Sequence, residues 1–452
     1  MGKGARFRAL AIVVVLLASA PAPLAGSAGA GDGSWDATIT DDPATVPALA
    51  PVEDPLETGA IQPKVKQAAG APILAETASL AGDGGRTTFR LGLSKGVTAE
   101  VFTLANPYRV VVDLPDVVFA LGQTTGRDGR GLVQAFRYGL FAEGKARVVL
   151  DASGPVKIEK AAMSAGADGR SVELQIDLVP MPAESFGGGT GAQRSSPHQQ
   201  KTAAIDEPAP RPKTGTKPVI MIDAGHGGVD PGAVGASNIY EKVIALAVAL
   251  ELRKELMATG RYDVRLTRSS DVFVSLDHRL KLSRTSGADL FISLHADSLE
   301  QKALAQSIRG ATVYTLSERA SDDQARLMAE KENASDLIAG LDAAETGGRD
   351  QVKNILIDLM KRETANFSAD FSKLLVSRLG KSVSLSRDPQ RSAAFKVLKQ
   401  TYAPAVLIEL GYMSHAEDEK LLNSPEWQHQ VASSVRASVD AFFAKQTARA
   451  RQ

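Results

Sequence analysis

Three residues far apart in the chain have the side chains of a catalytic metal site. His226 lies in AGHGG, Glu241 in NIYEKV and His295 in SLHAD. Two imidazoles and one carboxylate are a common ligand set for catalytic zinc, because three protein ligands leave a position open for water. Glu409, in VLIELGY, offers a further carboxylate that would move the proton of that water without binding the metal. If the four side chains converge, the chain is a zinc hydrolase.

Each of these residues also has a structural interpretation when it is taken singly. The spacing from Asn238 to Glu241 resembles a capping box at the start of a helix. A single histidine such as His295 is more often a core side chain with satisfied hydrogen bonds than a ligand. Glu409 follows an apolar run, where a carboxylate without a partner is costly. Asp230 either orients a ligating imidazole or stabilises a turn.

Other polar residues are weaker candidates. Arg268, Asp271 and Arg279 would orient substrate or lock loops through ion pairs, and the locking role is favoured. The remaining histidines stand among polar residues and are interpreted as surface or linker side chains: His198, His278, His415 and His429.

Composition limits the classes of function. A chain of 452 residues is expected to form two or more domains. Its formal net charge of zero gives no indication of a nucleic-acid partner. Because the chain has no cysteine, disulfides, thiolate zinc sites and cysteine nucleophiles are excluded. Any metal site must therefore use His, Asp or Glu.

The N-terminus has the pattern of an export signal, expected to cover residues 1–20. Lys3, Arg6 and Arg8 precede an apolar stretch over residues 9–20. That stretch is too short to cross a bilayer of roughly 30 Å, so cleavage is favoured over an uncleaved anchor. No later run is long enough to be transmembrane. Residues 21–71 are rich in Ala, Pro, Gly and Asp and predict a disordered linker.

The rest of the chain predicts two domains of different class. Over residues 72–180 apolar residues alternate with polar ones, which predicts a small all-β sandwich that binds rather than catalyses. Residues 181–217 read as a second linker. From residue 218 to 452 strand and helix patterns alternate, which predicts an α/β domain with a mostly parallel sheet flanked by helices. The expected strands are 219–222, 264–266, 290–294, 312–316 and 406–410, and the expected helices are 241–257, 276–286, 367–379 and 427–444.

The placement of the four candidates supports convergence. In open α/β sheets, sites gather beyond the carboxyl ends of the strands. His226, His295 and Glu409 all lie at, or just past, the end of an expected strand.

Taken together, the motifs resemble a known family. IDAGHGGVDPGAVG, YEK, ISLHAD and PAVLIELGYMS follow one another as in the zinc-dependent N-acetylmuramoyl-L-alanine amidases, and the upstream β domain resembles the AMIN domain. The resemblance implies Zn²⁺ held by His226, Glu241 and His295, with Glu409 as the catalytic carboxylate. It implies cleavage of the amide between N-acetylmuramic acid and L-alanine in peptidoglycan. Tyr412 stands where the family commonly has phenylalanine, a conservative change.

An insert, residues 317–365, suggests regulation. Residues 326–338 and 352–360 predict two helices, and the insert resembles the autoinhibitory helix of the cell-division amidases. In that group a glutamate fills the open metal position, and Glu332 is the candidate here, with Glu330 in reserve. The alternative is that both are solvated helix carboxylates. The resemblance further implies a LytM-type activator protein and a periplasmic, septal location.

Two other functions remain open at this stage. A zinc peptidase or carboxypeptidase acting on stem peptides would use the same ligands. A wall-binding or scaffold protein with a vestigial zinc site belongs to a different class, and the intact candidate set argues against it.

Overall fold

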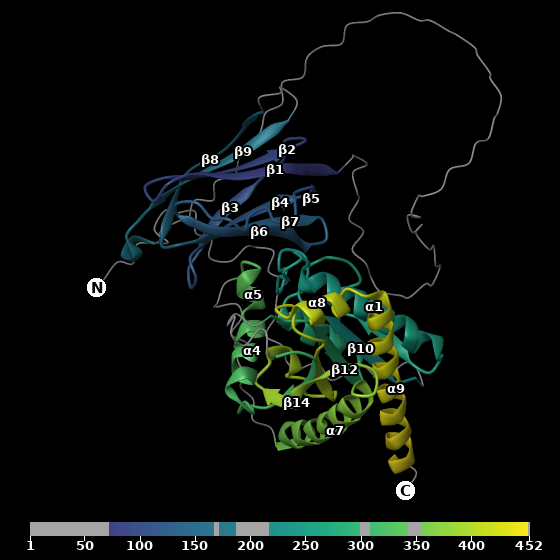
Figure 1. Ribbon diagram of the computed structural model, residues 1–452. Coiled ribbons are helices and arrows are strands. Elements are labelled where there is room, and N and C mark those ends of the chain that lie inside the picture. The colour runs from purple at the N-terminus through teal and green to yellow at the C-terminus, as the bar shows by residue number, and fades with distance from the viewer. Residues whose placement is uncertain (1–71, 167–170, 187–216, 299–307, 342–354, 451–452) are drawn as a thin grey trace, which may run out of the picture. The chain divides into compact units, whose positions relative to one another are not determined.

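The computed structural model describes residues 72–166, 171–186, 217–298, 308–341 and 355–450, which fall in one compact unit (Figure 1). The expected export signal, the first linker and nearly all of the second lie outside these residues. Among the helices described, none has the length and apolar character needed to cross a membrane.

Residues 72–186, the β region, form two sheets, followed by a short 3₁₀ turn, η1 (Ala183–Ser185). One sheet has the order β5-β1-β2-β9-β8 and the other the order β3-β4-β7-β6. All neighbouring strands are antiparallel except β1 and β5. The strands are β1 (Ile73–Gly82), β2 (Thr87–Leu93), β3 (Glu100–Leu104), β4 (Arg109–Pro115), β5 (Val117–Phe119), β6 (Val133–Ala142), β7 (Lys145–Ala152), β8 (Val156–Ala165) and β9 (Val172–Pro180).

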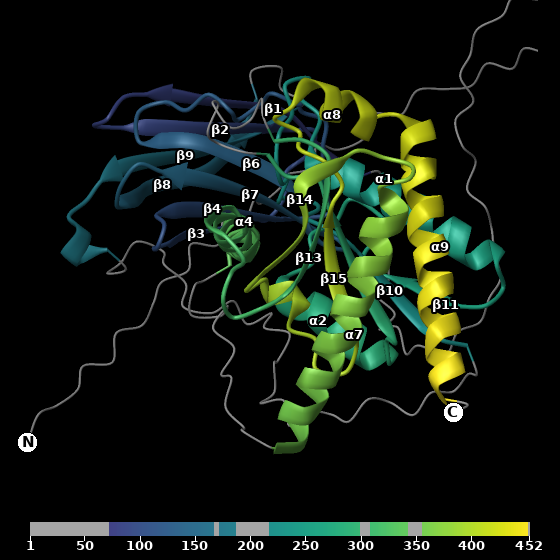
Figure 2. The ribbon, with the colours of Figure 1, turned by 60° about the horizontal axis from the view of Figure 1, so that its bottom comes forward.

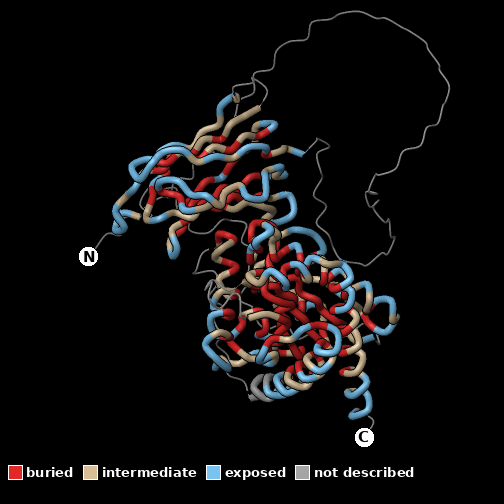
Figure 3. The backbone as a smooth tube through the Cα atoms, in the orientation of Figure 1, coloured by how far each residue is buried: buried red, intermediate tan, exposed pale blue. Residues whose placement is uncertain are grey.

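The two-residue period of the sequence explains the packing of these sheets. Phe89, Leu91 and Leu93 on β2 are fully buried, whereas the residues between them are half-buried. Successive strand side chains point to opposite faces, so each sheet turns one apolar face inward. The resulting core lies between the two sheets, as the predicted sandwich requires (Figure 3).

Residues 217–450, the α/β region, are built on a six-stranded sheet of order β11-β10-β12-β15-β13-β14. The first four strands are parallel, β13 is antiparallel to β15, and β14 is parallel to β13. The mostly parallel sheet is confirmed. The strands are β10 (Val219–Ala224), β11 (Asp263–Leu266), β12 (Leu290–His295), β13 (Ala311–Leu316), β14 (Leu385–Ala393) and β15 (Ala405–Glu409).

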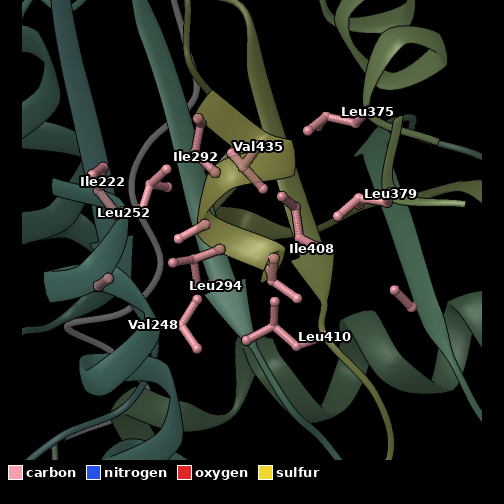
Figure 4. Close-up of a cluster of buried hydrophobic side chains, with 14 of the residues drawn as sticks. Ile222, Val248, Leu252, Ile292, Leu294, Leu375, Leu379, Ile408, Leu410 and Val435 are labelled. Carbon is pink, nitrogen blue, oxygen red and sulfur yellow. The ribbon is translucent and has the colours of Figure 1, made fainter. Parts of the chain in front are cut away.

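Helices cover both faces of this sheet. On one face α9 lies between α1 and α7 (Figure 2), and Val435 of α9 lies with Ile292 and Ile408 of the sheet (Figure 4). On the other face Met221 and Phe291 pack against α2, α4 and the 3₁₀ turn η2. The helices are α1 (Glu241–Ala258), α2 (Leu276–Ser286), α4 (Asp323–Asn333), α5 (Ser335–Ile338), α7 (Ile355–Leu379), α8 (Ala416–Leu422) and α9 (Pro425–Ala450), with η2 at Lys396–Leu398.

The structure departs from the predicted elements in four places. The single helix expected over 326–338 is two helices, α4 and α5, with Ala334 between them. The sequence LSRDPQRSA carries no apolar alternation, yet it forms β14, an edge strand, where Pro389 is tolerated. The short helix α8 was not predicted either. The expected separate helix over 352–360 is wrong where the structure describes it, because residues from Ile355 belong to the long helix α7.

Candidate metal centre and active site

His226 is held in an unusual backbone conformation just after β10. Its φ is +57°, in the left-handed region that favours glycine, and Gly227 and Gly228 continue the turn with positive φ. Asp230 closes the turn, with its Oδ2 2.9 Å from Nδ1 of His226 and its Oδ1 accepting from the Gly232 amide. Asp230 therefore orients the imidazole and stabilises the turn at once, so that Nε2 of His226 faces the site.

Glu241 begins α1, but it does not form the capping box that its sequence suggested. Asn238 has φ +65° and accepts a hydrogen bond from Arg127 through its side chain, and the residue before the helix, Tyr240, has no side-chain cap. The Glu241 carboxylate turns inward instead and accepts from the amides of Ala233 at 2.8 Å and Ala296 at 2.9 Å. It is fully buried, and its Oε1 faces both histidines.

His295 and Glu409 come from neighbouring strands. Each is the last residue of its strand, β12 or β15, and the two are opposite one another in the parallel register. Nδ1 of His295 lies 3.1 Å from Oε1 of Glu241. The Glu409 carboxylate accepts from the Asp297 amide at 3.0 Å through Oε2, while its buried Oε1 has no hydrogen-bond partner in the described part of the chain.

Four side chains converge on one point. Among the described residues, ligand atoms of His226, Glu241, His295 and Glu332 all lie within 4.8 Å of one another, and all four residues are buried. Oε2 of Glu332 is 3.1 Å from Nδ1 of His295 and 3.4 Å from Nε2 of His226. Of the two insert candidates it is thus Glu332 that reaches the cluster, whereas Glu330 is exposed and pairs with Arg326. Glu409 lies outside the four-residue group, next to His295.

Carboxylates dominate the electrostatics of this cluster. Burial alone would lower the pKa of His226, yet Glu241 and neighbouring carboxylates raise it well above its usual value. Against the same opposing effect of burial, Glu332 and Glu241 raise the pKa of His295 to about 10. Burial also raises the pKa of Glu409 well above its usual value. The cluster concentrates negative charge, so a bound cation is stabilised there.

One buried ion pair and several hydrogen bonds to main chain hold the loops that carry the candidates. Arg279 donates to Asp223 at 2.6 Å and to the carbonyl of His226 at 2.8 Å. Arg268 donates to the carbonyls of Ala224 and Gly225. Asp271 accepts from the Gly228 amide. The geometry matches the structural role favoured from the sequence, since each of these groups holds main chain.

The other histidines that the structure describes stay outside the cluster. His278 lies on α2 and His415 precedes α8. His429, which is exposed, lies with the half-buried Glu251 and Glu255, whose carboxylates already pair with Lys254 and Arg436. His198 lies outside the described residues.

Three residues that line the cluster escaped the sequence analysis. Asp297 is fully buried beside Glu409 and forms an ion pair with Lys331 of the insert. Ser335 donates to Asp230, the partner of His226. Asp297 could have been found from the sequence, because it stands in the same SLHAD segment as His295. Lys331 and Ser335 could not, because they reach the site only through tertiary packing. A small pocket beside the cluster is lined by residues that include Arg279 of α2, Glu332 of the insert and Phe395.

The end of the insert helix is held by the β region. Five consecutive carbonyls, from residue 337 to 341, accept hydrogen bonds from three arginines of the second sheet. The pairs are Arg109 with Leu337 and Leu341, Arg137 with Ile338, and Arg147 with Ala339 and Gly340. Arg147 is oriented by a bidentate ion pair with Asp113. The last carbonyls of a helix lack partners within the helix, so cations at that end satisfy them and complement the helix dipole.

Comparisons with known proteins agree with both regions. Residues 220–441 match a family model described as N-acetylmuramoyl-L-alanine amidase, and residues 79–176 match the AMIN domain model. The N-acetylmuramoyl-L-alanine amidase AmiC of Escherichia coli O6:H1 (strain CFT073) is 32% identical over 362 residues, which cover 78% of this chain and 85% of the relative. AmiC of Neisseria meningitidis serogroup B is 31% identical over 76% of this chain and 83% of its own length. AmiA of Escherichia coli K12 is 35% identical over 51% of this chain and 78% of its own length.

Proposed function

Because the chain belongs to the N-acetylmuramoyl-L-alanine amidase family, we propose that it hydrolyses the amide between N-acetylmuramic acid and L-alanine in peptidoglycan. The reaction removes stem peptides from the wall and serves cell separation. The observation that carries this proposal is the convergence of His226, Glu241 and His295 at the carboxyl ends of the strands, with Glu409 beside them.

The residues present suit a zinc ion. Nε2 of His226 is buried and, within the described ranges, has no hydrogen-bond partner, although it faces two carboxylates. Two imidazoles and a carboxylate form the donor set expected for catalytic zinc. His226, Glu241 and His295 would hold the ion, which when bound polarises the scissile carbonyl and lowers the pKa of water.

Glu409 is the proposed catalytic carboxylate. Its Oε2 is fixed by the Asp297 amide, while Oε1 is free to take a proton and to return it to the leaving amine. Burial, which raises its pKa, suits a group that must both accept and donate a proton. The Asp230 carboxylate holds His226 in the orientation that directs Nε2 inward.

The insert is proposed to keep the enzyme closed. Glu332 places Oε2 among the ligand atoms, at the position that water and substrate need. Lys331 and Ser335 add contacts with Asp297 and Asp230 on either side. An activator of the LytM type would displace the helix α4.

The location follows from the same resemblance. The export pattern at residues 1–20 supports transport to the periplasm, and the AMIN match supports a wall-targeting role for the β region at the division septum. Peptidoglycan is the expected partner of both regions.

The test is digestion of purified sacculi by the full chain, with bound zinc measured and products identified by mass spectrometry. We compare the wild type with Glu332→Ala and with Glu330→Ala, the exposed neighbour, as matched control. Glu332→Ala should release intact stem peptides at least about tenfold faster, which corresponds to about 1.4 kcal/mol of lost closed-state stability. Glu330→Ala should behave as the wild type.

Other products would favour the other functions. Peptides shortened within the stem indicate a peptidase. No release by any variant, with zinc bound, indicates a scaffold protein. Equal release by all three proteins would contradict the regulatory role of Glu332 while leaving the amidase activity intact.

A further inference from the structure

Resting on the proposed amidase function, we infer that Asp297 binds the nitrogen of the scissile amide and then the leaving L-alanine amine. Lys331 and Glu332 imitate the two charged products of the reaction, with the ammonium on Asp297 and the carboxylate among the metal ligands.

Asp297 has an acceptor that the fold does not use. Its side chain is fully buried, two residues after His295. Oδ1 accepts from the Ser298 amide at 2.6 Å and from Lys331, but the buried Oδ2 has no hydrogen-bond partner among the residues that the structure describes. The loop itself is held by main chain, since the amide of Asp297 donates to Glu409 and its carbonyl accepts from the amide of Met413. A buried carboxylate oxygen without a partner is costly, and a site for a donor from a ligand explains why it is there.

The neighbours of Asp297 are the groups that carry out the reaction. Its amide holds the carboxylate of Glu409, the proposed proton carrier. The carboxylate therefore stands beside the group that must protonate the leaving nitrogen. An acceptor at this position binds the amide N–H in the substrate and the more strongly charged ammonium in the product.

Lys331 presents an ammonium to this acceptor. Its Nζ forms the ion pair with Asp297 and donates to the carbonyl of Ser298 at 3.2 Å. The next residue, Glu332, extends its carboxylate to His226 and His295. The insert thus delivers a cation and an anion side by side into the centre of the site.

Amide hydrolysis yields the same pair of charges. The C–N bond breaks, the water oxygen bonds to the carbonyl carbon, and both water protons end on the nitrogen. The products are a lactyl carboxylate and an L-alanine ammonium, with total charge unchanged. A site that accommodates both products after cleavage has one position for an anion and one for a cation, and Glu332 and Lys331 occupy two such positions.

A simpler alternative is that Asp297 only anchors the insert. The two ideas predict opposite results for variants of the full, zinc-loaded chain acting on sacculi. Lys331→Met removes the cation and should raise peptide release by about tenfold. Asp297→Asn breaks the same ion pair but should not raise release, and the double variant should lose the gain. Lys331→Arg keeps the charge and should stay closed.

A second measurement does not depend on how well Asp297→Asn folds. The released stem peptide and its N-acetylated derivative are compared as inhibitors of the Lys331→Met protein. The free amine should inhibit at about tenfold lower concentration. Zinc content and thermal melting are recorded for every variant.

Three outcomes overturn the inference. If Asp297→Asn, or the double variant, releases peptides as fast as Lys331→Met, Asp297 only anchors the insert. Equal inhibition by the two peptides would exclude an amine subsite, and no gain from Lys331→Met would exclude the mimicry. If no variant releases stem peptides, the amidase function fails and the inference falls with it.

Discussion

His295 and Glu409 lie opposite one another in the sheet, each as the last residue of its strand. Neighbouring strands are about 4.8 Å apart, so the ladder of backbone hydrogen bonds fixes the separation of the two side chains. The proposed metal ligand and the proposed proton carrier therefore rest on the two central strands of the sheet. His226, just after β10, and Glu241, at the start of α1, complete the site.

Glu409→Gln should separate metal binding from turnover. The amide side chain keeps the size of the carboxylate and lies outside the four-residue cluster, so zinc should remain bound. Because it cannot carry a proton, peptide release should fall by about 10²- to 10⁴-fold. Zinc content by plasma mass spectrometry and product formation from sacculi give the two readings.

His226→Ala is the companion variant for that experiment. It removes one of the proposed ligands, so zinc and activity should disappear together. Full activity in Glu409→Gln, or zinc lost from it, would require a different assignment of the carboxylate.

Gly232→Ala should weaken metal binding although it replaces none of the proposed ligands. Gly232 has φ +66°, and a Cβ there would stand 2.6 Å from Cδ2 of His226 and 2.7 Å from Oε2 of Glu241. Both proposed ligands would have to move, and displacement of this kind costs about 10- to 100-fold in metal affinity. Competition with a chelator measures the change.

Gly260→Ala is a matched control for the backbone strain. Gly260 has φ +67°, but a Cβ would meet nothing within 4 Å. Its zinc affinity should equal that of the wild type. Equal losses in the two variants would show that strain, rather than displaced ligands, is responsible.

Asp223→Asn should lower stability and change its dependence on pH. Although burial opposes it, Arg279 holds the pKa of the Asp223 carboxyl below its usual value. The stabilisation is then complete above the unfolded value of about 3.9 and is lost as the pH falls through the lower folded value. Breaking this buried pair should lower the free energy of unfolding by about 3–5 kcal/mol near neutral pH. On acidification the variant should then lose less of its free energy of unfolding than the wild type.

Urea unfolding at several pH values between neutral and acid measures this effect. Asp263→Asn is the control, because its pair with Arg265 is exposed. If Asp223→Asn had the wild-type free energy of unfolding and the wild-type dependence of that free energy on pH, as the Asp263→Asn control should, Asp223 would have no such role.

Arg147→Met should loosen the insert from its far end. Arg147 donates to the carbonyls of Ala339 and Gly340 at 3.0 Å, and α5 follows α4 after a single residue. Loss of two hydrogen bonds from a charged donor favours an open insert, and basal peptide release should rise by about tenfold. Arg90→Met, which removes an ion pair with Glu173 in the other sheet, should leave release unchanged. Release that stays at the wild-type rate in both variants would show that the arginines do not restrain the insert.

Local pattern predicted the elements and the meeting of the candidates at the strand ends, but not the partners of individual side chains. The alternation around Phe89 and the apolar runs ending at His295 and Glu409 identified strands, because burial repeats with the period of the backbone. The capping-box interpretation of Asn238 and Glu241 failed, because both side chains found partners distant in the chain.

The contacts of Asp297 could not be foreseen for the same reason. Its partner Lys331 lies 34 residues away in the chain and belongs to an insert with its own helix signal. Spacing along the sequence gives the directions in which Lys331 and Glu332 leave their helix, but not the strand ends that the two side chains will meet. The identity of the four candidate residues was accessible from motifs, whereas the charge arrangement around them required the fold.

The three arginines that hold the insert donate only to its main chain. All five acceptors are peptide carbonyls, which every amino acid supplies. Substitutions at Leu337 and Ile338, which are half-buried, can therefore accumulate without loosening the hold. Ala339 is fully buried, Leu341 packs against the same apolar cluster, and Gly340 has φ +75°, so these three positions are restricted. The two half-buried positions can thus change what the segment offers to an incoming protein while its attachment stays the same.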